Sequence, residues 1–158
     1  MKDVKLFIDF SSTKKFEECD YYFKLVIRRA ILATLEHEGV LFNAEASVTL
    51  CDNDYIRRIN KQYRDKDSAT DVLSFPLYDF STEELFGVDD TVPLGDIVIS
   101  IERAKAQARE LGNTFLTEVA FLAVHSTLHL LGYDHERSAE DDEAQCQAQR
   151  EIMATLEI

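Results

Sequence analysis

The stretch "HSTLHLLGYDH" holds three of the four histidines in the chain. His125 and His129 are four positions apart, so in a helix their imidazoles lie on the same face and can reach one ion. Gly132 follows and can take the left-handed conformation that ends a helix, which turns the chain back and can bring His135 to the same point. Three neutral imidazoles suit zinc and leave a fourth coordination position open for water, as in catalytic zinc sites. The spacing therefore predicts a metal site at His125, His129 and His135.

The alternative is that these histidines are packed core residues, which is the usual role of a lone histidine on an apolar helix. Three at this spacing, on a helix otherwise rich in Leu, Ala, Val and Phe, favour a metal, because burying three polar rings together costs free energy unless something compensates. Asp134 is a candidate carboxylate behind the third ligand. The remaining histidine, His37, is interpreted as packed or solvent-exposed. Nickel, copper and iron also accept imidazoles, so the identity of the metal stays open.

The spacing also matches the metzincin protease motif HExxHxxGxxH at its histidines and glycine. Those proteases place a glutamate, their general base, directly after the first histidine, where this chain has Ser126. A serine cannot deprotonate a metal-bound water at neutral pH. The only methionine besides Met1 is Met153, which lies in a helical pattern and supplies no Met-turn. A metalloprotease-like hydrolase is therefore the least favoured interpretation.

The densest basic cluster of the chain comprises Arg57, Arg58, Lys61, Arg64 and Lys66. Arg57 and Arg58 are interpreted as part of a solvated helix face with acidic neighbours. Arg64 differs, because it ends the predicted helix just before a polar turn, where its guanidinium can project into a cleft. There it could hold a phosphate through two parallel hydrogen bonds.

Hydrophobic periodicity and capping residues predict the elements that position these groups. Strands are predicted at 4–9, 46–50, 71–77 and 95–100, and helices at about 13–38, 53–64, 101–111, 115–131 and 139–156. The order β-α-β-α-β-β-α-α-α, with helices late in the chain, favours an α+β fold. We expect one domain over 1–158, with a small mixed sheet of about four strands, about five helices, and the metal site at the end of a buried helix. The role of the acidic loop 78–92 stays open.

Composition narrows the classes of function. The net charge of −13 argues against a broad basic surface that grips nucleic acid, so RNA binding would need a local basic patch or a larger partner. Cys19, Cys51 and Cys146 are scattered, which predicts neither a disulfide framework nor a thiolate zinc cluster. The sequence shows no signal-peptide pattern and no membrane span, so we expect a cytoplasmic protein.

Three stretches of the chain resemble the YbeY-type endoribonuclease family of rRNA maturation factors. They are "NKQYRDKDSATDVLSFP" (60–76), "LGDIVIS" (94–100) and "HSTLHLLGYDH" (125–135). The triple-histidine motif together with "YRxKD…TDVLSFP" is highly specific for these bacterial metal-dependent enzymes, which act in ribosomal RNA maturation and ribosome quality control. Two positions depart from the usual pattern, since the family usually has glycine in place of Ser126 and often proline in place of Ala69.

The resemblance implies an α+β sandwich with His125, His129 and His135 as ligands of one Zn²⁺ ion and Arg64 as a catalytic residue facing it across a cleft. It implies a single-strand-specific metal-dependent endoribonuclease, in which metal-activated water attacks an RNA phosphodiester while Arg64 binds phosphate. The implied substrate is single-stranded RNA, including rRNA, and the implied partner is the small ribosomal subunit, with no membrane involved. The general base and the oligomeric state stay open. The alternative hypothesis of a non-catalytic, metal-stabilised ribosome-assembly factor also stays open, and the net charge favours it.

Overall fold

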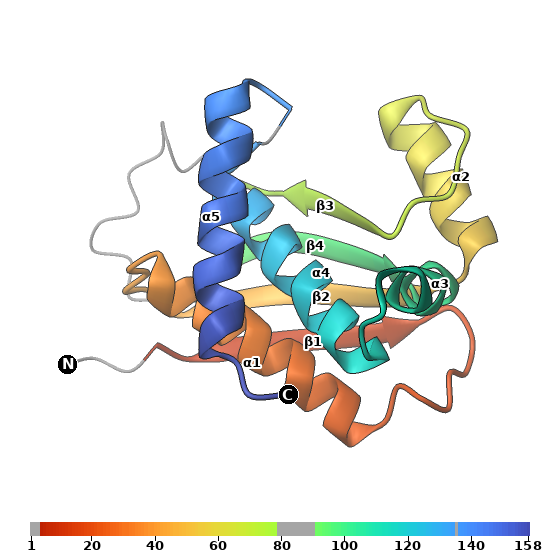
Figure 1. The fold of residues 1–158 in the computed structure, drawn as a ribbon, viewed down its shortest axis with the longest axis horizontal. Helices are drawn as coiled ribbons and strands as arrows, with labels where there is room; N and C mark the ends of the chain where they lie inside the picture. Colours follow the sequence, from red (N-terminus) through yellow and green to blue (C-terminus); the bar gives the residue numbers. More distant parts are fainter. Residues whose placement is uncertain (1–3, 79–90, 135) are drawn as a thin grey trace.

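The computed structural model describes residues 4–78, 91–134 and 136–158. The strands are β1 (Leu6–Ser12), β2 (Ala44–Cys51), β3 (Val72–Pro76) and β4 (Val92–Ser100). The helices are α1 (Tyr21–His37), α2 (Asn53–Arg64), α3 (Ile101–Leu111), α4 (Phe115–Leu130) and α5 (Ala139–Thr155). The predicted order of elements is confirmed, and so is the α+β class with a small mixed sheet (Figure 1).

The strands form one sheet in the order β1-β2-β4-β3. β1 pairs parallel with β2 and β2 pairs parallel with β4, whereas β3 pairs antiparallel with β4 at one edge of the sheet. The pairing of β2 with β4 shifts by one residue between Glu45 and Ala46, opposite Gly95. Gly95 has a φ of +143°, and a Cβ there would lie 2.2 Å from the carbonyl oxygen of Phe75. Only glycine therefore allows β3 to stay paired with β4 at this irregularity.

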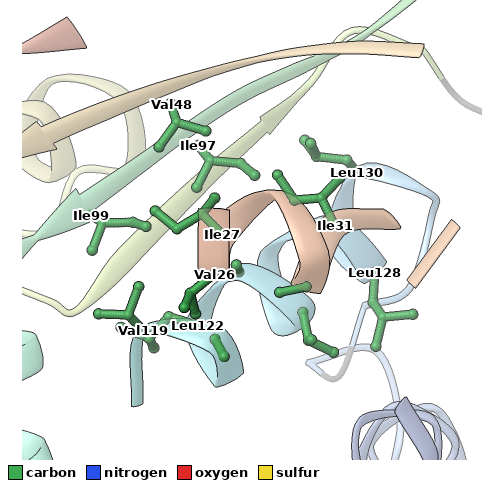
Figure 2. Close-up of a cluster of buried hydrophobic side chains, with 14 of the residues drawn as sticks. Val26, Ile27, Ile31, Val48, Ile97, Ile99, Val119, Leu122, Leu128 and Leu130 are labelled. Carbon is green, nitrogen blue, oxygen red and sulfur yellow. The ribbon is translucent and has the colours of Figure 1, made fainter. Parts of the chain in front are cut away.

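The main hydrophobic core lies between the sheet and helices α1, α4 and α5, which cover one of its faces (Figure 1). Figure 2 shows its centre, where α1, α4 and the two middle strands contribute branched side chains: Val26, Ile27, Ile31, Val48, Ile97, Ile99, Val119, Leu122, Leu128 and Leu130. A smaller cluster joins Ile56 of α2 to Leu73 and Val98. Because strand side chains alternate between faces, Val98 lies opposite Ile97 and Ile99, and α2 covers part of the other face.

The first helix begins later than its apolar pattern predicts. It starts at Tyr21, and the side chain of Asp20 caps it by accepting a hydrogen bond of 3.0 Å from the N–H of Phe23. Phe16 lies within the predicted helix 13–38, but it packs on the core from the connection that follows β1. In that connection Thr13 donates its N–H to the carbonyl of Leu50. Apolar periodicity could not separate a core-packed connection from a helical turn.

Within the part of the chain that the structure describes, no helix is both long enough and apolar enough to cross a membrane.

Candidate active site

A cleft of about 670 Å³ lies along the edge strand β3, between the loop that follows α2 and the turn that follows α4. Arg64 and Lys66 line this cleft, and so do His125 and His129. Residues of the loop before β3 and of β3 itself also line it, including Ser68, Thr70, Asp71, Val72 and Ser74. The fold thus brings together two groups that are about sixty residues apart in the sequence.

Helix α4 positions the two described histidines. Thr114 caps its start, where Oγ1 accepts a hydrogen bond from the N–H of Thr117. The imidazole centroids of His125 and His129 are 4.7 Å apart with an interplanar angle of 73°, so the rings share a helix face. At the other end of the helix, Gly132 has a φ of +112°, a backbone conformation that side-chain-bearing residues rarely adopt. The chain therefore turns directly after the histidine pair.

The third predicted ligand, His135, lies outside the described residues. Among residues 4–78, 91–134 and 136–158, no three His, Cys, Asp or Glu side chains are grouped as a metal site. Asp134 accepts a hydrogen bond of 3.0 Å from the N–H of Glu136 and lies 3.9 Å from the Nε of Arg137. In the described residues, Asp134 therefore shapes the turn after the helix.

Helix α5 contributes two polar side chains that sequence reasoning missed. Nδ1 of His125 is hydrogen-bonded to Oε1 of Gln149, and Nε2 of Gln145 lies 3.3 Å from the same nitrogen. Both glutamines are buried. Their spacing of four residues was visible in the sequence, but glutamines on a charged helix are mostly solvent-exposed. Only the packing of α5 against α4 shows which face they occupy.

Ser126 is fully buried, and its hydroxyl is hydrogen-bonded to that of Ser74 on β3. This contact joins the edge strand to the helix that carries the histidines. The position that holds the base in metzincin proteases is therefore occupied by a structural hydroxyl. A buried serine paired with a second serine supplies no carboxylate to accept a proton.

Arg64 occupies the last turn of α2, and the loop after it is held by local hydrogen bonds. Asp65 adopts a left-handed conformation with a φ of +55°, which ends the helix. The side chain of Asn60, which is buried, donates to the carbonyl of Ser68 across 2.9 Å. Arg64 itself is exposed and lines the cleft. The guanidinium of Arg64, carried by the end of α2, can contact a ligand in the cleft.

The neighbouring arginines have the structural roles that the sequence predicts. Arg57 bonds to Asp67 at 2.7 Å, which raises the pKa of Arg57 and lowers the pKa of Asp67. The guanidinium of Arg58 lies 5.9 Å from the ring centroid of Tyr55. Neither residue lines the cleft described above.

Asp71 organises the start of β3. One carboxylate oxygen accepts from the N–H of Val72 at 2.8 Å, and the other accepts from Nε2 of Gln107 at 3.1 Å. The same Gln107 nitrogen donates to Glu118 of α4 across 2.7 Å. Gln107 and Glu118 were not identified from the sequence. This network connects α3, α4 and the strand beside the cleft.

His37 is bound by two carboxylates at the junction of α1 and α5. Its Nδ1 lies 2.6 Å from Glu38 and its Nε2 lies 2.7 Å from Glu151. The bond to Glu151 and then the bond to Glu38 raise the pKa of His37. Burial, with a further contribution from Glu38, raises the pKa of Tyr133 to about 12, so this cleft residue is a neutral phenol at physiological pH.

The three cysteines are free, as the sequence predicts. Cys51 is buried in the smaller core cluster, whereas Cys19 and Cys146 are only partly buried. Burial is the main reason that the pKa of Cys51 rises to about 12, which makes it a poor nucleophile.

Comparison with known proteins places this arrangement in a family. The pattern of the family "Endoribonuclease YbeY" matches residues 9–157. Endoribonuclease YbeY of Caldanaerobacter subterraneus subsp. tengcongensis is 53% identical over 122 residues, which are 73% of this chain and 76% of that protein. Endoribonuclease YbeY of Bacillus cereus is 43% identical over 152 residues, or 95% and 96% of the two chains.

The fold is also similar to the solution structure of TM1509 from Thermotoga maritima. The two chains share 27% sequence identity with a TM-score of 0.56, over 93% of this chain and 89% of the other. Both relatives named above exceed 40% identity over most of their length, and the family pattern covers nearly the whole chain. The chain therefore belongs to the endoribonuclease YbeY family.

Proposed function

We propose that this protein is a metal-dependent endoribonuclease that cuts single-stranded RNA during ribosomal RNA maturation. The observation that carries the proposal is the cleft that places Arg64 in the same hollow as His125 and His129. Membership of the family supplies the class of reaction, and the cleft supplies a cation for phosphate and nitrogen donors for a metal. The ribosome, through its small subunit, is the proposed setting of the reaction.

The described histidines fit a transition-metal ion such as zinc. Two imidazoles lie side by side on one helix face, and hydrogen bonding of a ring nitrogen to a neighbouring polar group is the usual support of a metal-binding histidine. His125, His129 and, by the sequence motif, His135 would hold the ion. When bound, it would lower the pKa of water and withdraw charge from a phosphoryl oxygen.

Arg64 would bind a non-bridging phosphate oxygen and offset the negative charge that develops during cleavage. Lys66 also lines the cleft and adds a second positive charge. Both belong to the one dense basic cluster of a chain that carries a net charge of −13. RNA would therefore be recognised through this local patch and through the ribosome.

The test compares three purified variants for metal content and for cleavage of a labelled single-stranded RNA. Arg64→Ala is expected to keep its metal and to cut RNA about 10²–10³-fold more slowly, because a donor to the developing charge is lost. His129→Ala is expected to lose both metal and cleavage. Arg58→Ala is the matched control, since Arg58 lies on the same helix but outside the cleft. Wild-type cleavage rates in Arg64→Ala would contradict the proposal.

The net charge favours a second candidate, a non-catalytic ribosome-assembly factor whose metal ties the turn after α4 to the helix. Free RNA would be weakly attracted to so acidic a molecule. The two candidates differ in turnover. Cleavage that a chelator abolishes and a divalent metal restores would exclude the assembly factor as the whole function. Metal binding with no cleavage of any RNA, free or ribosomal, would favour it.

A further inference from the structure

Two buried glutamines of α5 meet the same imidazole nitrogen from neighbouring helical turns. Gln145 is 1% exposed and Gln149 is 7% exposed. Oε1 of Gln149 is hydrogen-bonded to Nδ1 of His125, whereas Nε2 of Gln145 lies 3.3 Å from that nitrogen and 3.5 Å from the carbonyl oxygen of His125. Burying two amides beside one ring costs free energy unless their hydrogen bonds compensate for the lost hydration.

The two contacts favour opposite tautomers of His125. An amide oxygen can only accept, so the bond to Gln149 requires a hydrogen on Nδ1 and leaves the ring lone pair on Nε2. An amide N–H can only donate, so a bond from Gln145 would require the lone pair on Nδ1 and a hydrogen on Nε2. A neutral imidazole satisfies one of these demands at a time.

The geometry favours Gln149. Its oxygen makes the shorter of the two contacts, and the N–H of Gln145 has a second acceptor in the carbonyl of His125. Oε1 of Gln145 is buried without a hydrogen-bond partner among the described residues, so Gln145 is the less well satisfied of the pair. With the hydrogen on Nδ1 directed at α5, the metal-binding lone pair lies on Nε2, across the ring from α5.

We propose that Gln149 is a positioning residue that fixes the Nδ1–H tautomer of His125 and so prepares Nε2 to bind a metal. Gln145 opposes it and sets how strongly that tautomer is preferred. This inference rests on the proposed function, because it concerns the preparation of the same site. It assigns to α5 a role in the chemistry that its sequence does not reveal.

The packing of α5 holds Gln149 in place. Ala148 and Ile152 of α5 belong to the main core, and Glu151 bonds to His37 of α1. The helix is thus held from two sides around Gln149. A side chain fixed in this way can direct a ring more firmly than one on a loop.

The test uses the full chain, with and without Zn²⁺, in two measurements. Nitrogen-15 NMR of the metal-free protein, at a pH where the ring is neutral, reports which nitrogen of His125 carries the hydrogen. Competition with a coloured chelator reports the affinity for Zn²⁺. The variants are Gln149→Met, which removes the acceptor, Gln149→Glu, which keeps it, and Gln145→Met. Gln147→Met, on the exposed side of the same helix, is the matched control.

We expect the wild type to show the Nδ1–H tautomer. Gln149→Met should populate the Nε2–H tautomer and bind Zn²⁺ about 10–100-fold more weakly, the usual effect of losing such a support. Gln149→Glu should restore the tautomer and the affinity. Gln145→Met should bind Zn²⁺ at least as tightly as the wild type, and Gln147→Met should not differ from it.

Three outcomes would overturn the inference: an Nε2–H tautomer in the wild type, unchanged Zn²⁺ affinity in folded Gln149→Met, or a loss in Gln145→Met equal to that in Gln149→Met. The wild-type spectrum decides the point even if a variant fails to fold. A wild type that binds no Zn²⁺ or other divalent metal would instead contradict the proposed function. The tautomer measurement would still judge the role of Gln149.

Discussion

At the scale of single residues, Ser126 distinguishes this chain from metzincin proteases, which share its histidine spacing but have a glutamate at this position. Its hydroxyl is buried against β3 and bonded to Ser74, so it acts on the structure of the cleft. Ser74 lines the cleft, whereas Ser126 does not. Their hydrogen bond therefore connects the lining of the cleft to α4. A hydrogen bond in such a place contributes to stability and to the position of the edge strand.

Replacing Ser126 should reveal that contribution. Ser126→Ala is expected to lower the free energy of unfolding by about 1 kcal/mol, the usual net value of one hydrogen bond. Ser126→Gly should cost about 1 kcal/mol more, because glycine is unfavourable inside a helix. Urea denaturation of both variants, with Ser74→Ala and the double alanine variant, completes a mutant cycle. Additive effects of the two alanines would show that the hydroxyls do not interact.

The side-chain amide of Gln107 connects different segments of the chain, because it donates to the carboxylates of both Asp71 and Glu118. Gln107→Leu should lower the free energy of unfolding by about 2–3 kcal/mol, because Glu118 is 1% exposed and would lose a donor. Gln107→Glu should destabilise as well, by adding a third carboxylate. Urea midpoints measure both effects. An unchanged midpoint for Gln107→Leu would mean that the network contributes nothing to the fold.

At the scale of elements, the contact of α1 with α5 depends on pH. Bonding to Glu151 and Glu38 raises the pKa of His37 above 6.5, so its contribution is complete below that pH and is lost as pH rises through the folded-state pKa. The same contact lowers the pKa of Glu151 below 4.5, so its contribution is present above that pH and is lost as pH falls. The contact is therefore strongest between these two values.

His37→Gln should accordingly destabilise the protein more at about pH 5.5 than at about pH 9. Urea denaturation of wild type and variant at both pH values gives the two differences in free energy of unfolding. Glu151→Gln should show the same dependence, since it removes the other member of the pair. A difference that is the same at both pH values would contradict the assignment.

The elements themselves were largely predictable, for local reasons. Caps such as Thr114 and Ser138 and the stop at Gly132 act within a few residues, so the sequence shows them directly. The start of α1 was predicted too early, because Phe16 packs on the core from a connection rather than from a helix. The irregular pairing at Gly95 depends on Phe75 in another strand, and no local pattern contains that information.

The site was predictable only in part for the same reason. The spacing of His125 and His129 follows from helix geometry, so their shared face could be expected. The glutamines of α5 carry no local signal, because their role depends on how that helix packs across α4. Arg64 could be singled out from its helix end, but its place in the same cleft as the histidines follows from the topology that puts β3 on the sheet edge.

At the scale of the whole molecule, charge limits how RNA can be bound. The chain has 17 Lys and Arg against 30 Asp and Glu. Several of the basic residues are already bonded to acidic ones, as Arg57 is to Asp67 and Lys105 is to Glu18. An extended basic track is therefore not expected. Among the described residues three cations line the cleft, but Arg137 already lies near Asp134 and Asp141, so Arg64 and Lys66 are the main candidates for phosphate contacts.

This arrangement predicts a weak dependence of RNA binding on salt. Two phosphate contacts give a slope of roughly −1.4 for single strands, so affinity for a short RNA should fall only about sevenfold between 50 and 200 mM salt. Screening of the repulsion between RNA and an acidic protein should reduce even that fall. Fluorescence anisotropy with a labelled RNA, in chelator to prevent cleavage, measures the slope, and Arg64→Ala should make it about 0.7 shallower. A loss of about a thousandfold over this range would require many more phosphate contacts than the cleft provides, and would contradict recognition by a local patch.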